Sequence, residues 1–433
     1  MLESETFLGK DSTFSDEKLQ RKEEYISQNE IFGINRHVLV LSLCAAFNSV
    51  IIGFNLGVFG GVVFVLQDYM NLDTFQSELL IGMLNFVAIF GSIVAGYTSD
   101  KYGRLKTFIF ASVLFFIGGL VLILSSNFFV LMLGRTIVGL GTGISFSVDP
   151  LYIAEISPKE VRGALVTLSE IAINVGIVLG YFSTWLFSSV NSSISWRLML
   201  SVGVVLPLIM LFLCLFKMDE TPRYLLMQGN PRKAMSVLLK LSKDNETAVC
   251  IFEDIKLALE KEADYDQVPI ISLIRGKNLA KPLKRIMMVV IVVAIAQQFS
   301  GVDGVMGFIS FTLKKAGMTK NEDLFGHQLF IGILKTLMIL VSARLLDDKV
   351  GRRILLLISS VGSAAAHASI AIGSMFKILW LETLGLYAFA MFFSVGLGPV
   401  SWLIISEIVP LRVRSNGIMI GVSLNRFAGF LVA

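Results

Sequence analysis

The feature that most constrains the fold of this chain is a series of eleven apolar runs, each long enough to cross a bilayer of about 30 Å. They begin near residues 38, 80, 107, 129, 164 and 198, and again near 286, 327, 354, 384 and 416. Inside a bilayer every backbone polar group needs an internal partner, so such runs predict helices. The composition agrees, because 55% of the residues are hydrophobic and only 16% are charged. We therefore expect an all-α protein that spans a membrane many times.

The two sets of runs divide the chain into four parts. We predict a cytosolic N-terminal tail over 1–37, a six-helix bundle over 38–217, a cytosolic linker with short helices over 218–285, and a second, incomplete bundle over 286–433. In the linker, Asn230 followed by Pro231 is a typical helix start. Apolar residues at helical spacing follow in Met235–Leu241 and Ile251–Leu259, so we expect two or three short amphipathic helices there. The first 30 residues are polar, which argues against a signal peptide.

Basic residues predict the orientation of the helices. They occur in the N-terminal tail and in alternate loops, at Lys101–Lys106, Arg162, Lys349–Arg353 and Arg412–Arg414. The positive-inside rule then places the N-terminus in the cytosol. The three cysteines form no CxxC pair, so we expect neither a disulfide framework nor a metal site.

The two halves of the chain repeat the same short motifs. Asp100–Arg104 reads Asp-Lys-Tyr-Gly-Arg, and Asp348–Arg352 reads Asp-Lys-Val-Gly-Arg. A glutamate precedes an arginine by seven residues in Glu155–Arg162 and again in Glu407–Arg414. Repeated halves within one membrane chain indicate a transporter whose bundles rock about a site near the midplane.

A polar stretch interrupts the first helix of the second half. Eleven apolar residues, Ile286–Ala296, lead into Gln297–Phe308, which places two carboxamides, a hydroxyl and a carboxyl among three glycines. Such polar groups are costly in hydrocarbon unless they face a partner or a wet cavity. The glycines let the backbone bend or open. We interpret this stretch as part of a binding site for a ligand rich in hydroxyl groups.

These motifs resemble those of the sugar porter family of the major facilitator superfamily. The resemblance rests on the repeated Asp-x-x-Gly-Arg loops, and on Glu155–Gly163, Asp219–Arg223 and Gln297–Gly301. Three further segments are similar to the plant polyol/monosaccharide transporters: Ser169–Tyr181, Ser195–Leu200 and Phe393–Trp402. The resemblance implies a major facilitator fold of two pseudo-repeated helix bundles. About 11 of the expected 12 spanning helices are present, so we expect a C-terminally incomplete chain.

The family's substrate positions can be carried over one residue at a time. The resemblance implies that these side chains contact the sugar: Asn55, Thr167, Glu170, Asn174, Gln297, Gln298, Asp303, Lys335, Trp402 and Asn425. Each has a plainer alternative, since Glu170 and Lys335 could pair with other charges, the carboxamides could join helices, and Trp402 could serve packing alone. Family members also carry a tyrosine pair where this chain has Gly307–Phe308, which predicts looser closure on the outer side.

A second set of charged residues is expected to form a cytosolic gate. The resemblance implies this role for Asp100, Arg104, Glu155, Arg162, Glu220, Arg223, Asp348, Arg352, Arg353, Glu407 and Arg414. Such charges would pair when the inner side is closed and separate when it opens. The alternative is that these charges only set the topology. Lysine alone could do that, whereas arginine forms bidentate pairs with carboxylates.

The first helix bears on whether protons are coupled to transport. Proton-coupled sugar porters carry an aspartate that faces a helix-four arginine, here Arg135, at the position that this chain fills with Asn55. Asparagine cannot titrate, so the resemblance favours facilitated transport. Asp149, Glu170 or Asp303 could take over the proton, which keeps a proton-coupled symporter open as the alternative.

We therefore predict a carrier for a polyol or monosaccharide that works by alternating access and is not an enzyme. The chain could instead be a sugar sensor that moves nothing, or an inactive shortened paralogue. We expect no cofactor, no metal and no nucleic-acid partner; the partners are the sugar, the lipid bilayer and, in a proton-coupled carrier, protons. The plasma membrane is preferred over the vacuolar membrane.

Overall fold

The computed structural model describes residues 30–31, 34–158, 161–263, 281–347, 351–410 and 414–432. These residues are almost entirely helical. One antiparallel pair of two-residue strands, β1 (Glu30–Ile31) and β2 (Ile34–Asn35), precedes the first described helix. Most of the predicted N-terminal tail lies outside the described residues.

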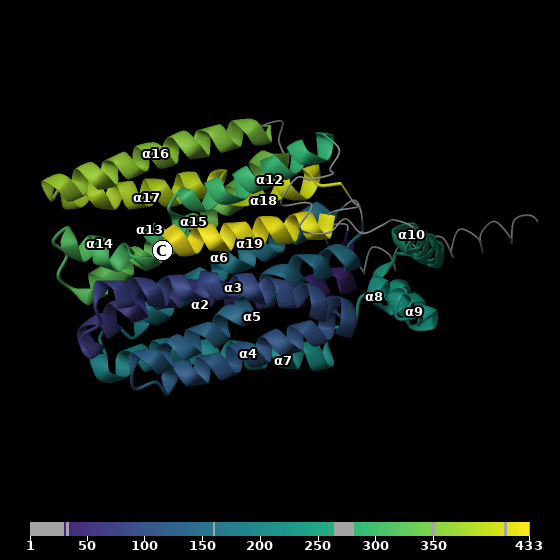
Figure 1. Cartoon of the computed structure of the whole chain (residues 1–433), viewed down its shortest axis with the longest axis horizontal. Helices are drawn as coiled ribbons and strands as arrows, with labels where there is room; N and C mark the ends of the chain where they lie inside the picture. The colour runs from purple at the N-terminus through teal and green to yellow at the C-terminus, as the bar shows by residue number, and fades with distance from the viewer. Residues whose placement is uncertain are drawn as a thin grey trace, which may run out of the picture.

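The first half of the chain forms six long helices, each roughly antiparallel to the next. They are α2 (Arg36–Met70), α3 (Thr74–Tyr102), α4 (Arg104–Ile123), α5 (Phe128–Ile156), α6 (Arg162–Leu186) and α7 (Ser192–Phe216). Short polar connections with capping side chains separate them; Asp73, for example, forms a capping box at the start of α3. In Figure 1 these helices make up the lower part of the molecule, which we call the first bundle.

The helices of the second half are more often broken. They are α12 (Lys281–Phe299), α13 (Val302–Gly307), α14 (Ile309–Lys315), α15 (Asn321–Asp347), α16 (Arg352–Phe376), α17 (Leu379–Val395), α18 (Pro399–Ile408) and α19 (Arg414–Val432). We call them the second bundle, the upper part in Figure 1. The predicted bend in the polar stretch is present: Gly301 has φ +83°, a left-handed conformation that favours glycine, and it separates α12 from α13.

The described part of the linker contains three short helices. They are α8 (Pro222–Met227), α9 (Pro231–Leu241) and α10 (Asn245–Ala263), and α9 begins after Asn230 with Pro231 in its first turn. Residues 264–280 of the predicted linker lie outside the described residues. The three helices lie beyond one end of the bundles (Figure 1). We call this the linker end, and the opposite end, where residues 71–73 join α2 to α3, the far end.

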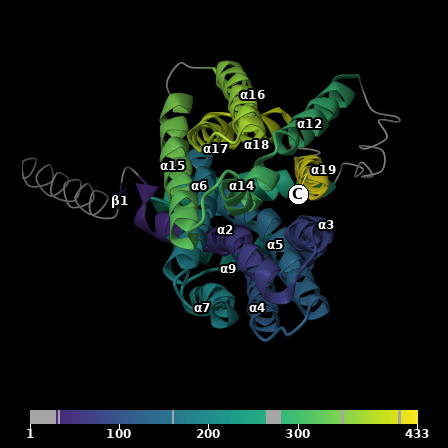
Figure 2. The same cartoon turned by 90° about the vertical axis from the view of Figure 1, so that its left-hand side faces the viewer.

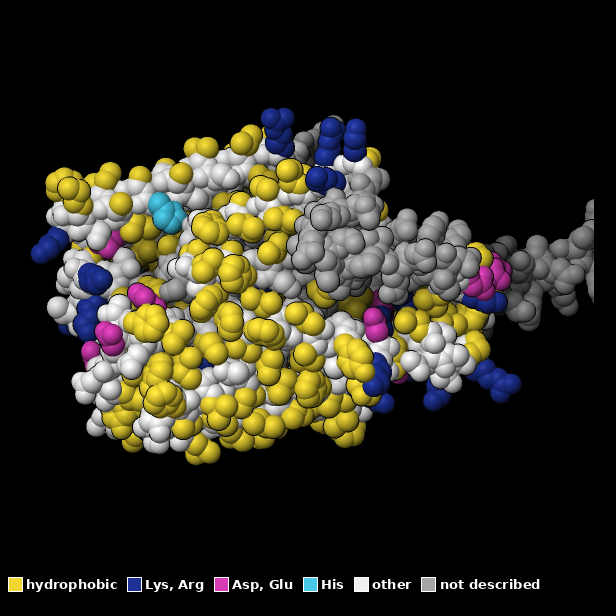
Figure 3. Space-filling view, in the orientation of Figure 1, with side chains coloured by type: hydrophobic (Ala, Val, Ile, Leu, Met, Phe, Trp, Pro, Cys, Tyr) yellow, Lys and Arg dark blue, Asp and Glu magenta, His cyan; other side chains and the backbone are white. Residues whose placement is uncertain are grey.

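The described helices are long and apolar enough to make this a multi-pass membrane protein. Ten segments of the described residues qualify as membrane spans, and Gly417–Val432 is a shorter apolar helix. Together they correspond to the eleven apolar runs of the sequence. Hydrophobic side chains cover the lateral surface, while charged side chains gather towards the two ends (Figure 3).

The two bundles meet along two pairs of helices and at the far end. α19 packs along α3, and α15 packs along α6. Seen from the far end, α14 lies between α2 of the first bundle and α17 of the second (Figure 2). There, a Cβ on Gly60 of α2 would lie 2.9 Å from the carbonyl oxygen of Gly307 in α13. The backbones of the two bundles therefore touch at this point.

Aromatic and charged side chains extend this contact at the far end. The ring of Phe64 in α2 meets the rings of Phe311 and Phe325 edge-on at 5.2 and 5.8 Å, and Asp68 pairs with Lys314 at 3.4 Å. The sequence predicted looser closure here because the tyrosine pair is missing. In this conformer, glycine at position 307 instead allows direct backbone contact, and phenylalanines supply the aromatic surface.

Candidate functional site

Three carboxamides from two helices of the second bundle form one hydrogen-bonded array. The Asn425 Nδ2 donates to Gln297 Oε1 at 2.8 Å, and the Gln298 Nε2 donates to Asn425 Oδ1 at 3.2 Å. The Gln297 Nε2 also donates to the Leu397 carbonyl at 3.0 Å, at the break between α17 and α18. All three amide side chains are at least 95% buried. The structure thus brings together three of the predicted substrate contacts, Gln297, Gln298 and Asn425.

Two further polar residues complete this array, and the sequence analysis missed both. Arg426 donates from Nε and Nη2 to Asn425 Oδ1 at 3.1 and 2.6 Å, and from Nη1 to Asn85 Oδ1 at 3.1 Å. The Asn85 Nδ2 donates to Asp303 Oδ2 at 2.8 Å. Asn85 belongs to α3, so the array extends across the contact between the bundles. The sequence could have indicated Arg426, because an arginine inside an apolar run usually has a functional role.

Four charged side chains, including Arg426 of the array, interact electrostatically with one another. Glu170 of α6 and Asp303 of α13 both lie within electrostatic range of Lys335 of α15 and Arg426 of α19. Lys335 is 8% exposed, and its Nζ lies 5.6 Å from the centre of the Phe393 ring. Two acids and two bases leave this cluster without net charge, so it suits a neutral ligand.

The remaining predicted contact residues lie in different surroundings. Thr167 and Asn174 hydrogen-bond back to their own helix, at the carbonyls of Gly163 and Glu170. Asn55 does the same, at the Ile51 carbonyl 2.9 Å away. Trp402 is half-buried on α18 and packs in an apolar cluster with α12 and α19 side chains.

Unused hydrogen-bonding capacity remains inside the protein. Among the described residues, the buried oxygens Asn174 Oδ1 and Gln298 Oε1 have no protein partner, and neither do the buried hydroxyls of Ser169 and Ser394. A buried polar group without a partner costs about 1–3 kcal/mol. Groups of this kind are suited to bind the hydroxyls of a ligand.

Arg135 lies in α5, the fourth spanning helix, and contacts groups other than a carboxylate. Its Nε donates to the Leu80 carbonyl at 3.0 Å, and its guanidinium lies 3.6 Å from the centre of the Phe59 ring. Asn55 donates to its own helix, one turn before Phe59. Both members of the predicted proton-coupling pair therefore contact other groups of the first bundle, and the buried Arg135 Nη1 has no hydrogen-bond partner among the described residues.

A separate hollow of about 810 Å³ opens near the far end of the second bundle, away from the array. Its lining includes Met318, His327, Lys377, Trp380 and Tyr387. It contains none of the predicted substrate contacts. Within the described residues, no three His, Cys, Asp or Glu side chains gather as a metal site would require.

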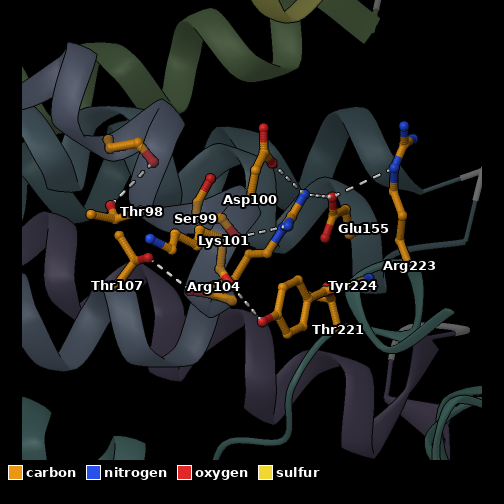
Figure 4. A network of polar contacts seen from close by, with 12 residues as sticks. Thr98, Ser99, Asp100, Lys101, Arg104, Thr107, Glu155, Thr221, Arg223 and Tyr224 are labelled. Atoms are coloured by element: carbon orange, nitrogen blue, oxygen red, sulfur yellow. Dashed lines mark hydrogen bonds and ion pairs between the residues drawn. The ribbon is translucent and has the colours of Figure 1, made fainter. Parts of the chain in front are cut away.

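Four charged residues predicted for the gate form a network at the linker end of the first bundle (Figure 4): Asp100, Arg104, Glu155 and Arg223. Arg104 Nη2 lies 2.9 Å from Glu155 Oε1 and 3.5 Å from Asp100 Oδ1, and Arg223 Nε lies 3.9 Å from the same Glu155 oxygen. Arg162 Nη2 donates to the Ser157 carbonyl at 3.4 Å. The ion pairs join α3, α4 and α5 of the first bundle to α8 of the linker.

Glu220 caps the start of α4. Its Oε1 accepts from the Arg104 backbone N–H at 3.0 Å, and its Oε2 accepts from the Leu105 N–H at 3.1 Å. Burial raises the pKa of the Glu220 carboxyl above its usual value, and the backbone N–H groups of Thr221, Leu105 and Arg104 oppose that rise. A carboxylate at a helix N-terminus satisfies donors that otherwise lack partners.

Gly103 makes this cap possible. It has φ +100°, and a Cβ there would lie 2.3 Å from Glu220 Oε2. We expect Gly103→Ala to destabilise the protein by about 1–3 kcal/mol through backbone strain alone. The repeat provides a control, because Gly351 has φ −63° and open space around it, so Gly351→Ala should be neutral. Thermal unfolding midpoints measure both; equal midpoints would contradict the requirement for glycine at position 103.

The corresponding network of the second bundle is exposed. Arg352 Nη2 lies 3.0 Å from Glu407 Oε1, and the two side chains are 46% and 45% exposed. Arg353 is exposed at the start of α16. Asp348 and the side chain of Arg414 lie outside the described residues.

Known proteins match nearly the whole chain. The profile of the family described as sugar (and other) transporter matches residues 41–433. "Probable polyol transporter 6" of Arabidopsis thaliana is 35% identical over 427 residues, covering 93% of this chain and 85% of that protein. "Polyol transporter 5" of the same plant is 35% identical over 419 residues, covering 92% and 77%.

Solved structures share the fold. The xylose transporter XylE from E. coli in a partially occluded inward open conformation superposes with a TM-score of 0.77 at 22% identity, covering 92% of this chain and 91% of XylE. The proton:xylose symporter XylE bound to 6-bromo-6-deoxy-D-glucose also gives 0.77, at 23% identity, covering 92% and 87%. With the repeated motifs, the two bundles and the buried polar array, these matches show that the chain belongs to the sugar porter family of the major facilitator superfamily.

Proposed function

We propose that this protein carries a neutral polyol or monosaccharide across a membrane by alternating access. The observation that carries the proposal is the buried array of Gln297, Gln298 and Asn425 beside a charge cluster to which both bundles contribute. Carboxamides both donate and accept hydrogen bonds, carboxylates accept them, and Lys and Arg donate them, which matches a ligand made of hydroxyls. The names of the plant relatives and of XylE support this substrate class.

The contacts at the far end suggest how access would alternate. In this conformer α2 meets α13 and α14 there, through Gly60, Phe64 and Asp68. Opening that end requires these contacts to separate while the bundles close elsewhere, as in other carriers with repeated halves. We place the linker end and the N-terminus in the cytosol, from the distribution of basic residues, and the protein in the plasma membrane.

We infer that transport is facilitated rather than proton-coupled. Asn55 cannot titrate, its side chain bonds to its own helix, and Arg135 contacts a backbone carbonyl and an aromatic ring. Uptake of labelled sorbitol, inositol and glucose into proteoliposomes should therefore be nearly independent of external pH. Asn55→Asp should introduce pH dependence, because it places a titratable group one turn from the ring that Arg135 covers. Strong pH dependence of the unmodified protein would refute this mode, and absence of any uptake would favour a sensor.

Asp149 supports a second candidate, proton-coupled transport. It is 1% exposed in α5, and its carboxylate accepts from Asn48 Nδ2 at 2.7 Å and Ser49 Oγ at 2.6 Å, both on α2. A buried carboxylate held by neutral donors is a group suited to bind a proton. If this candidate is correct, uptake depends on pH and Asp149→Asn removes that dependence. Equal pH profiles for the two proteins would exclude Asp149 as the proton site.

A further inference from the structure

Arg426 is a buried guanidinium of the second bundle that contacts the first. Its Nη1 donates to Asn85 Oδ1 of α3 at 3.1 Å, and its Cζ lies 4.7 Å from the centre of the Phe146 ring in α5. Only 6% of the residue is exposed. Its head group therefore lies against two helices of the other bundle.

The same guanidinium fixes the orientation of a carboxamide in the array. Two of its nitrogens, Nε and Nη2, donate to Asn425 Oδ1. A guanidinium can only donate, so it holds the oxygen of the amide towards itself and the nitrogen away. That nitrogen is the group that donates to Gln297 Oε1. Arg426 thus determines which hydrogen-bonding groups of the array remain for a ligand.

Asn85 is held from two sides. Its Oδ1 accepts from Arg426, and its Nδ2 donates to the Asp303 carboxylate. Gly429, one turn after Asn425, provides the room: a Cβ there would lie 2.9 Å from Asp303 Oδ2 and 3.2 Å from Asn85 Nδ2. A neutral amide between a cation and an anion has one preferred orientation and two charge-assisted bonds.

We propose that Arg426 is a positioning residue of the substrate site, which orients Asn425 and links that orientation, through Asn85, to the contact between the bundles. This inference rests on the proposed function of the site. When α3 moves relative to α19, Asn85 leaves Arg426 and Asp303, and the constraint on Asn425 changes with it. The affinity of the site for its sugar then depends on the arrangement of the bundles.

Binding of tritiated sorbitol to the purified protein tests the proposal, with inositol and xylose as further probes. Arg426→Lys keeps the charge but loses the fork that reaches Asn425 and Asn85 together. We expect its dissociation constant to rise about tenfold or more. Asn85→Ala should also raise it, and the double variant should be no weaker than Arg426→Lys alone, because both changes break one link.

Ser92→Ala is the matched control. Ser92 of α3 lies 3.4 Å from the Ser423 hydroxyl of α19, so it makes a polar contact between the same two helices without touching Arg426. Its dissociation constant should stay close to that of the unmodified protein. Unchanged binding by Arg426→Lys would overturn the proposal. The proposal would also be overturned if Asn85→Ala raised the dissociation constant no more than Ser92→Ala does. A double variant whose fold-change equals the product of the Arg426→Lys and Asn85→Ala fold-changes would overturn it too.

The proposed function and the link can fail separately. If the unmodified protein binds none of the three probes, the proposed substrate class is wrong. The link is then measured by the thermal unfolding midpoints of the unmodified protein, the two single variants and the double variant. Non-additive shifts support the link between Arg426 and Asn85, and additive shifts overturn it.

Discussion

Arg104→Ala is expected to lower the free energy of unfolding by about 3–5 kcal/mol, the usual cost of removing one partner from a buried ion pair. Arg104 and Glu155 have side chains only 3% and 7% exposed, and their charged atoms lie 2.9 Å apart. Arg104 Nη1 also donates to the Ser99 carbonyl at 2.9 Å. Alanine would leave the Glu155 carboxylate buried, with the Arg223 Nε 3.9 Å away as a more distant cation.

The repeat supplies the control for this prediction. Arg352 and Glu407 occupy the corresponding positions of the second half, at nearly the same separation, but both side chains are almost half exposed. An exposed pair contributes about 0–1 kcal/mol, so Arg352→Ala should hardly change the unfolding midpoint. Because the two motifs are alike in sequence, the difference between the two variants measures the effect of burying the ion pair. Equal losses of unfolding free energy for the two variants would contradict the claim that the buried Arg104–Glu155 pair stabilises the protein more than the exposed Arg352–Glu407 pair does.

Glu170→Gln is expected to reduce uptake strongly. It leaves Asp303 as the remaining acid of the cluster against Lys335 and Arg426, so the site acquires a net positive charge in a buried setting. Lys335→Gln produces the opposite imbalance. The double variant restores neutrality. We therefore expect its loss of unfolding free energy to be smaller than the sum of the two single losses by about 0.5–3 kcal/mol, the usual coupling within one charge network.

Uptake and stability separate the two roles of Glu170. If the carboxylate contacts the sugar, the double variant regains its unfolding midpoint but not its uptake. If Glu170 and Lys335 serve only to pair with each other, the double variant regains both. A double variant whose loss of stability equals the sum of the single losses would show that the two charges do not interact.

The spanning helices were predictable because membrane helices leave long apolar runs, and the linker helix after Asn230 was predictable from its capping residues. Gln297 and Gln298 were predictable as a pair, because two carboxamides in an apolar helix need partners. Their partner Asn425 came from the resemblance. The contact of Arg426 with Asn85 was not predictable, since it depends on how two helices far apart in the chain are aligned.

The charge motifs show a different limit. Asp100–Arg104 and Asp348–Arg352 look alike in sequence, and nothing in either motif distinguishes a buried pair from an exposed one. The difference arises from the surroundings: Glu220 and Tyr224 cover Arg104 from the segment that follows α7, and Arg352 remains exposed. Arg104 pairs with Glu155 within the first bundle, and Arg352 pairs with Glu407 within the second.

The central claim is that polar side chains of both bundles bind one polyhydroxylated ligand between them. Equilibrium binding of labelled sorbitol, inositol, glucose and xylose to the unmodified protein, to Glu170→Gln in the first bundle and to Gln298→Leu in the second tests it most directly. We predict that one ligand binds saturably and that each variant weakens the same ligand by about tenfold or more. Saturable binding that neither variant changes would contradict a shared site.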